Sequence, residues 1–107
     1  KSRGLLLRFL GHEVAMAHDG AEAVTMAQSF QPAVILMDIG LPKLNGYDAT
    51  RQIRRLAGGQ SITIVALTGW GQEADRAESR AAGCDGHLVK PVELADLIPY
   101  VESRRGS

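Results

Sequence analysis

Two continuous apolar runs, AVILM at 33–37 and ITIVAL at 62–67, constrain the fold of this chain more than any other feature. Both contain β-branched residues and neither is interrupted by a charged residue, which is typical of strands covered on both faces. Between the runs, Ala49, Ile53 and Leu56 recur at helical spacing, and the pattern stops before Gly58. Strands alternating with helices predict an α/β fold with a parallel sheet and right-handed crossovers.

The rest of the chain continues this alternation. Further strands are predicted at 12–17 and 87–89, and further helices at 19–30, at 72–82 and from about 93 onward. Asp19, with Glu22 three residues later, predicts the cap of the first of these helices, and Gly83 predicts the end of the second. Pro99 is expected to kink or fray the last helix, whose inward residues are predicted to be Leu94, Leu97, Ile98 and Val101.

Length and charge limit the number of domains and the classes of partner. A chain of 107 residues is expected to form one domain. It has 12 basic and 12 acidic residues, and this balance argues against a nucleic-acid partner, which requires a basic excess. Arg51, Arg54 and Arg55 do cluster, and we interpret them as the solvated face of a helix.

The single cysteine, Cys84, excludes a disulfide within the chain and fits a reducing compartment. We interpret it as a small filler of the core rather than a nucleophile. No apolar stretch approaches the roughly 20 residues of a membrane span, and the short run Leu5–Leu7 is followed by Arg8 rather than continuing as a signal peptide. The expected location is the cytoplasm, with no membrane partner.

Three functional side chains follow three of the predicted strands. Asp38 ends the first apolar run, Thr68 follows the second, and Lys90 follows the strand at 87–89. Each also has an ordinary structural explanation: Asp38 could cap a turn, Thr68 could simply end a strand, and Lys90 could extend to solvent. Ligands of parallel α/β sheets bind outside the carboxyl ends of the strands, however, and the topology brings these three residues to that edge.

An acid, a hydroxyl and an amine at one edge suit phosphoryl chemistry. A carboxylate can attack phosphorus and form an acyl phosphate, while cations and donors stabilise the equatorial oxygens of the transferring group. Lys90 offers a compact positive charge, Thr68 offers a hydroxyl, and Gly69 leaves room for the incoming group. Gly40 lets the backbone come close, so that its carbonyl oxygen can bind a metal ion.

These segments together resemble the receiver domain of bacterial two-component response regulators, the CheY-like fold. The matching pieces are VILMDIGLPKLNGYD, IVALTG and GCDGHLVKPV, and the resemblance covers nearly the whole chain, 1–107, as a single domain. It implies a flavodoxin-like parallel sheet with flanking helices, in which the family's strand order is 2-1-3-4-5. It also implies a phosphorelay signalling domain that catalyses its own phosphorylation and is not a turnover enzyme.

The resemblance assigns a role to each matching position. Asp38 is the implied phosphoacceptor, and Lys90 is the lysine that pairs with the phosphoryl group, with a cis peptide bond expected between Lys90 and Pro91. Thr68 is the implied switch hydroxyl and His87 occupies the position of the switch aromatic residue. The expected cofactor is Mg²⁺, bound by Asp38 and by the backbone carbonyl of Gly40.

The implied partner is a histidine kinase or a histidine phosphotransfer protein, which donates the phosphoryl group from a phosphohistidine. Phosphorylation adds about 1.5 to 2 negative charges at Asp38. Thr68 and Lys90 then gain a charged partner, His87 moves into the space that Thr68 leaves, and a protein-interaction face changes shape. The wording GHLVKPVEL resembles receivers fused to hybrid histidine kinases.

The start of the chain departs from the family pattern. KSRGLLLRFLG matches the latter part of the family's first helix, so the first strand and its adjacent pair of acids, roughly 15 residues, are expected to be absent. Mg²⁺ affinity is then expected to be weakened. Three outcomes are expected for the sheet: the second strand closes directly onto the third, a partner chain fills the gap by homodimerisation or strand exchange, or the domain is N-terminally incomplete.

Two other functions remain open from the sequence. A haloacid-dehalogenase-like phosphatase also has an aspartate nucleophile at a strand end, but it needs a second Asp two residues later, where this chain has Gly40. A receiver-like interaction module that works without phosphorylation is the alternative that the expected absence of the acidic pair favours.

Overall fold

The computed structural model describes residues 5–38, 46–68 and 80–102. In chain order its elements are β1 (Leu5–Phe9), β2 (His12–Ala17), α1 (Gly20–Phe30), β3 (Val34–Asp38), α2 (Gly46–Arg55), the 3₁₀ turn η1 (Gly59–Ser61), β4 (Thr63–Thr68), β5 (Gly86–Val89), the 3₁₀ turn η2 (Leu94–Leu97) and α4 (Ile98–Glu102). Residues 80–82 are also helical and end at the turn formed by Gly83. The strands of the two apolar runs and the helices α1 and α2 therefore lie where the sequence predicts them. Residues 72–79 of the helix predicted at 72–82 lie outside the described residues.

The five strands form one sheet in the order β1-β2-β3-β4-β5. The pairs β2–β3, β3–β4 and β4–β5 are parallel, as the α/β pattern predicts. The direct pairing of β2 with β3, in which Val14 faces Val34 and Ala17 faces Met37, confirms one of the three outcomes expected for the sheet. The β1–β2 pair is antiparallel and places β1 at the edge.

The interpretation of residues 1–11 as the end of a helix is wrong for the part that the structure describes. Leu5–Phe9 is a strand, and Phe9 pairs with His12 across a two-residue turn of Leu10 and Gly11. Both turn residues have positive φ angles, 53° and 81°, as two-residue hairpins with a type I′ turn require. The apolar residues of this strand divide between the two faces of the sheet: Leu6 packs on the core beneath α1 and α2, and Phe9 packs on the core beneath α4.

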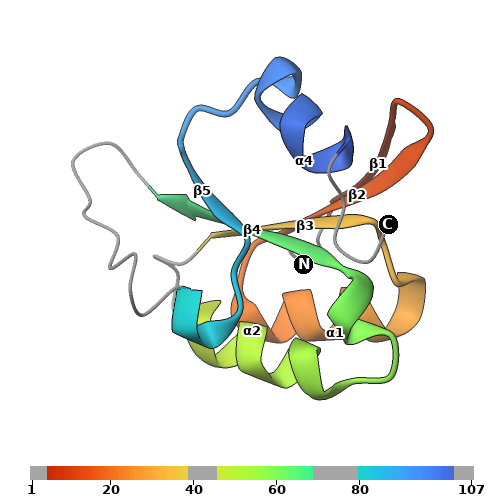
Figure 1. The fold of residues 1–107 in the computed structure, drawn as a ribbon, viewed down its shortest axis with the longest axis vertical. Coiled ribbons are helices and arrows are strands. Elements are labelled where there is room, and N and C mark those ends of the chain that lie inside the picture. Colours follow the sequence, from red (N-terminus) through yellow and green to blue (C-terminus); the bar gives the residue numbers. More distant parts are fainter. Residues whose placement is uncertain (1–4, 39–45, 69–79, 103–107) are drawn as a thin grey trace.

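Helices cover both faces of the sheet, so β3 is buried on each side (Figure 1). On one face α1 and α2 pack over a core that includes Ala15, Ile35 and Ile64. On the other, η2 and α4 pack over a core that includes Val14, Leu36 and Val65. The continuous apolar runs are explained by this burial on two sides. Among the described residues, no helix has the length and apolar character needed to cross a bilayer.

The start of α1 agrees with the sequence prediction, whereas the last helix differs from it. Asp19 caps α1 by accepting a hydrogen bond from the Glu22 N–H at 2.8 Å. The predicted last helix is divided into η2 and α4, which places Pro99 in the first turn of α4, where a missing N–H is tolerated. Leu97 and Val101 are buried as predicted, but Leu94 and Ile98 are exposed because only one side of these short elements meets the sheet.

The hairpin turn gives the first testable prediction. Leu10 is 58% exposed and has a positive φ, which is unfavourable for a leucine by about 1 kcal/mol, whereas asparagine tolerates it. Leu10→Asn is therefore expected to raise the free energy of unfolding by about 1 kcal/mol, measured by urea denaturation. Leu94→Asn is the control, because Leu94 is 53% exposed and has no positive φ. An equal gain there would contradict the explanation.

Candidate functional site

The structure brings Asp38 and Lys90 together at the carboxyl edge of the parallel strands. Asp38 is the last residue of β3 and lies in register with Leu67 of β4, while Lys90 follows β5 directly after Val89. The Lys90 Nζ donates to Asp38 Oδ2 at 2.5 Å. The Asp38 side chain is 14% exposed and that of Lys90 is 43% exposed, so a largely buried carboxylate is paired with an amine that reaches solvent.

This arrangement provides a nucleophile with a cation beside it. A charge-assisted bond of this length is stronger than a neutral hydrogen bond. The ammonium group can also interact with oxygens added to Asp38, since its position at the edge leaves it accessible from solvent. The pair therefore has two of the components that phosphoryl transfer to an aspartate needs, a carboxylate and a positioned positive charge.

The other predicted site residues are placed only in part. Thr68 is the last residue of β4 and pairs in register with Val89, which puts its backbone at the same edge as Asp38. The Thr68 side chain, Gly40 and Gly69 lie outside the described residues, so their predicted roles stay predictions. The peptide bond between Lys90 and Pro91 is cis, the geometry that the resemblance implied.

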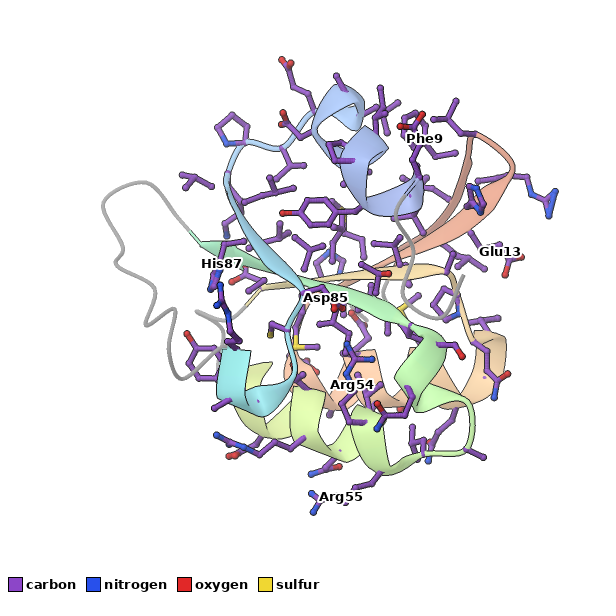
Figure 2. The ribbon with its side chains drawn as sticks, viewed as in Figure 1. Phe9, Glu13, Arg54, Arg55, Asp85 and His87 are labelled. Atoms are coloured by element: carbon purple, nitrogen blue, oxygen red, sulfur yellow. The ribbon has the colours of Figure 1, made fainter. Side chains whose placement is uncertain are left out.

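His87 lies in the middle of β5, in register with Ala66 of β4. Its side chain is half-buried, its ring Nε2 is buried, and it lies on the edge strand of the sheet (Figure 2). The backbone of His87 is three residues from Lys90, on the same strand that carries Lys90 to the site. Its predicted role as a switch stays a prediction.

The beginning of α1 lies at the same edge, which sequence reasoning did not use. His18 follows Ala17, whose register partner on β3 is Met37, the residue before Asp38. Glu22 Oε1 accepts from the His18 backbone N–H at 2.6 Å and lies 3.3 Å from its Nδ1. Glu22 and Asp19 together cap the helix that starts beside the candidate site. The direct β2–β3 pairing is what brings this cap next to Asp38.

The interpretation of the arginine cluster as one solvated face is wrong for Arg54. Its side chain is 9% exposed and lies between α2 and the sheet, whereas Arg55 points away from the protein (Figure 2). The guanidinium donates to four acceptors, which are the carbonyl oxygens of Gly59 (2.6 Å), Ile62 (2.6 Å) and Gly83 (2.7 Å) and the carboxylate of Asp85 (2.9 Å). We call Arg54 and these four acceptors the Arg54 network.

Helix geometry explains the position of Arg54 once the burial of α2 is known. Thr50, four residues earlier, is fully buried, and residues four apart share a helix face. Arg54 therefore extends the buried side of α2, and only burial with carbonyl acceptors keeps a charged group there. Arg51 fits the original interpretation, since it forms an exposed ion pair with Asp48 at 2.8 Å. Cys84 also fits its prediction: it is half-buried, free and packed against the core beneath α1 and α2.

The described residues do not by themselves fit a Mg²⁺ site. They contain no group of three or more His, Cys, Asp or Glu side chains that is arranged to hold a metal ion. The one carboxylate at the centre of the edge, Asp38, already binds the Lys90 ammonium. Mg²⁺ prefers several oxygen ligands in octahedral geometry. The expected absence of the family's acidic pair and the expected weakness of Mg²⁺ binding stay predictions.

Comparison with known proteins identifies the family. Residues 3–102 match the response regulator receiver domain. Because this match covers most of the chain, the chain belongs to the response regulator receiver domain family. The flavodoxin-like (CheY-like) fold class is thereby confirmed.

Relatives and solved structures agree with this assignment. The chain is 36% identical to protein PilH of Pseudomonas aeruginosa, over 87% of this chain and 77% of PilH. It is 36% identical to the response regulator MprA of Mycobacterium tuberculosis, over 86% of this chain but only 39% of MprA.

Two solved structures are similar in three dimensions. The receiver domain of the sensor histidine kinase PA1611 from Pseudomonas aeruginosa, solved with magnesium in its active-site cleft, superposes with a TM-score of 0.67 at 39% identity, covering 83% of this chain and 73% of that one. Chemotaxis protein CheY4 of Vibrio cholerae gives a TM-score of 0.67 at 28% identity, covering 80% and 72% of the two chains.

The ion pair gives the second prediction. In a double-mutant cycle of Asp38→Asn and Lys90→Met, the coupling free energy is expected to be about 1 kcal/mol at low salt, because Asp38 is largely buried while Lys90 is partly screened by solvent. The coupling should fall in 1 M NaCl. Urea denaturation of the four proteins measures it.

The Arg51–Asp48 pair on α2 is the matched control. Both of its side chains are more than 40% exposed, so its coupling should stay below about 0.5 kcal/mol. Equal coupling in the two pairs would show that burial of Asp38 adds nothing to the bond with Lys90.

Proposed function

We propose that this receiver domain accepts a phosphoryl group on Asp38 from the phosphohistidine of a histidine kinase or a histidine phosphotransfer protein. The observation that carries the proposal is the bond between Asp38 and Lys90 at the carboxyl edge of β3 and β5. Asp38 is partly accessible there, and the neighbouring lysine supplies the positive charge that an added phosphoryl group needs.

The proposed reaction is a transfer between two nucleophiles. An Asp38 carboxylate oxygen forms the new O–P bond while the P–N bond of the donor phosphohistidine breaks and the imidazole leaves. Lys90 exchanges its bond to Asp38 for one to the phosphoryl oxygens, which keeps its charge compensated throughout. The backbone position of Thr68 at the same edge supports a role for its hydroxyl as a further donor.

The proposed output is a change in a protein-interaction surface around β5, η2 and α4. Val89, Leu94 and Ile98 are large exposed apolar residues on these three elements. β5 connects this surface to the site because Lys90 follows it directly, and His87 is the proposed moving residue within it. The similarity to the receiver of a sensor histidine kinase supports a place within a hybrid kinase or downstream of one. Homodimerisation remains part of the proposal.

A second function, that of an interaction module that works without phosphorylation, is favoured by one observation. The described residues do not assemble a group of metal ligands around Asp38. In this alternative the Asp38–Lys90 bond is a permanent structural contact, and the surface around β5 and α4 binds a partner in one state only.

The two functions are separated by covalent labelling, which is the third prediction. Incubation with acetyl phosphate and Mg²⁺, followed by mass spectrometry, is expected to add one phosphoryl group to the wild-type chain and none to Asp38→Asn. Asp48→Asn is the matched control because Asp48 is an exposed acid at the start of α2. Its labelling should equal that of the wild type.

Labelling that persists in Asp38→Asn would contradict the assignment of the phosphoacceptor. A complete lack of labelling in the wild type, together with partner binding that Asp38→Asn leaves unchanged, would favour the interaction module.

A further inference from the structure

The Arg54 network lies where β4 and β5 begin, at the opposite end of these strands from Lys90. Arg54 joins the end of α2 to the segment that precedes each strand: Ile62 comes directly before β4, and Asp85 comes directly before β5. In Figure 2 Asp85 lies beside the guanidinium, at the edge of the sheet. One buried side chain thus fixes the starting points of two neighbouring strands relative to each other.

Asp85 extends the β4–β5 ladder by one step. Its backbone N–H donates to the Ile64 carbonyl oxygen at 2.7 Å, and its Oδ2 accepts from the Ile64 N–H at 2.9 Å. The same Oδ2 accepts from Arg54 Nη2 at 2.9 Å. Both backbone groups of Ile64 on this side are therefore bound by a residue that Arg54 holds in place, and Gly86 then pairs with Val65 as the first residue of β5.

Apolar packing constrains the register of β5 only weakly. Gly86, His87 and Leu88 are half-buried and Val89 is exposed, whereas four of the five residues of β3 are fully buried. A one-residue slip reverses the face of every side chain, and burial resists such a slip only where one face is strongly apolar. Gly86 packs closely against Tyr100 and Leu88 packs against the core on the α4 side. At the start of β5 these packing contacts are joined by the polar contacts of Asp85 and Arg54, which tie the strand to β4 and α2.

We propose that Arg54 is a positioning residue for Lys90: by holding Asp85 it sets the register of β5 on β4 and so places the Lys90 amine against Asp38. A slip of one residue moves Lys90 along the strand by about 3.3 Å. That shift exceeds the 2.5 Å length of the Lys90–Asp38 bond. The importance of this placement for phosphoryl transfer rests on the proposed function, but the placement itself does not.

Gly83 provides independent support. Its φ of 111° is unfavourable for other residues, and a Cβ there would lie 3.0 Å from Arg54 Cγ and 3.1 Å from Arg54 Nε. The chain therefore approaches the Arg54 side chain as closely as a glycine permits, and the Gly83 carbonyl accepts from both Nε and Nη2. The turn before β5 is shaped around this guanidinium, which a solvated arginine does not require.

The test, our fourth prediction, measures the coupling between Asp38 and Lys90 in different Arg54 backgrounds. The Asp38→Asn and Lys90→Met cycle is repeated in Arg54→Lys, which keeps the charge but loses the planar fork of donors. Most of the coupling is expected to be lost, because the two side chains no longer meet in one geometry. A role in stability alone lowers all four members of the cycle equally and leaves the coupling unchanged.

Arg55→Lys is the matched control, since Arg55 is the adjacent arginine and is exposed. It is expected to leave the coupling at its wild-type value. Unchanged coupling in Arg54→Lys, or an equal loss in Arg55→Lys, would overturn the proposal. If Arg54→Lys does not fold, Asp85→Asn gives the same decision, because it weakens the contact from the β5 side while keeping Arg54.

A kinetic measurement links the placement to the reaction. If Arg54 acts through Lys90, Arg54→Lys slows labelling of Asp38 in the wild-type background but adds nothing in Lys90→Met. Additive losses would overturn the link to Lys90. Absence of all Asp38 labelling in the wild type would count against the proposed function, and the coupling measurement would still decide the role of Arg54.

Discussion

The structure depends on the pairing of β3 with a parallel strand on each side. β2 and β4 satisfy its backbone hydrogen-bonding groups, while helices on both faces bury Val34–Met37. A chain segment with no access to solvent favours apolar side chains, and a charged side chain is accommodated most easily where the strand leaves the sheet. Asp38 occupies that point, so the position of the candidate nucleophile follows from the burial of the strand before it.

Sequence reasoning located the core strands and the Asp38–Lys90 pair because both depend on local patterns. Burial on two faces produces an uninterrupted apolar run, and parallel topology then brings the residues after each run to one edge. These arguments need no knowledge of contacts between distant side chains. Residues 38 and 90 are far apart in the sequence, yet their side chains are bonded. Their strands, β3 and β5, lie on either side of β4 in one sheet, so both residues reach the same edge.

The two wrong predictions, for Leu5–Phe9 and for Arg54, have a common cause. In both cases tertiary contacts decided between two structures that the local sequence allows. Leu5–Phe9 fits a helix or a strand equally well, and the turn at Leu10–Gly11 with pairing to β2 selects the strand. Arg54 belongs to a charged cluster in the sequence, but the carbonyl groups that surround it come from segments up to 29 residues away. Neither contact leaves a periodic pattern.

The strands on either side of β4 acquire their register in different ways. For β3 the apolar side chains on both faces specify it, since any slip exposes part of the core. For β5, which is short and half-exposed, polar contacts at one end replace this constraint. Under the proposed function, β5 is the strand that responds to charge added at Asp38, because it is packed less completely than β3. The combination of a fixed β3 and a β5 that is anchored mainly at its start suits a strand that carries a signal from the site to a surface.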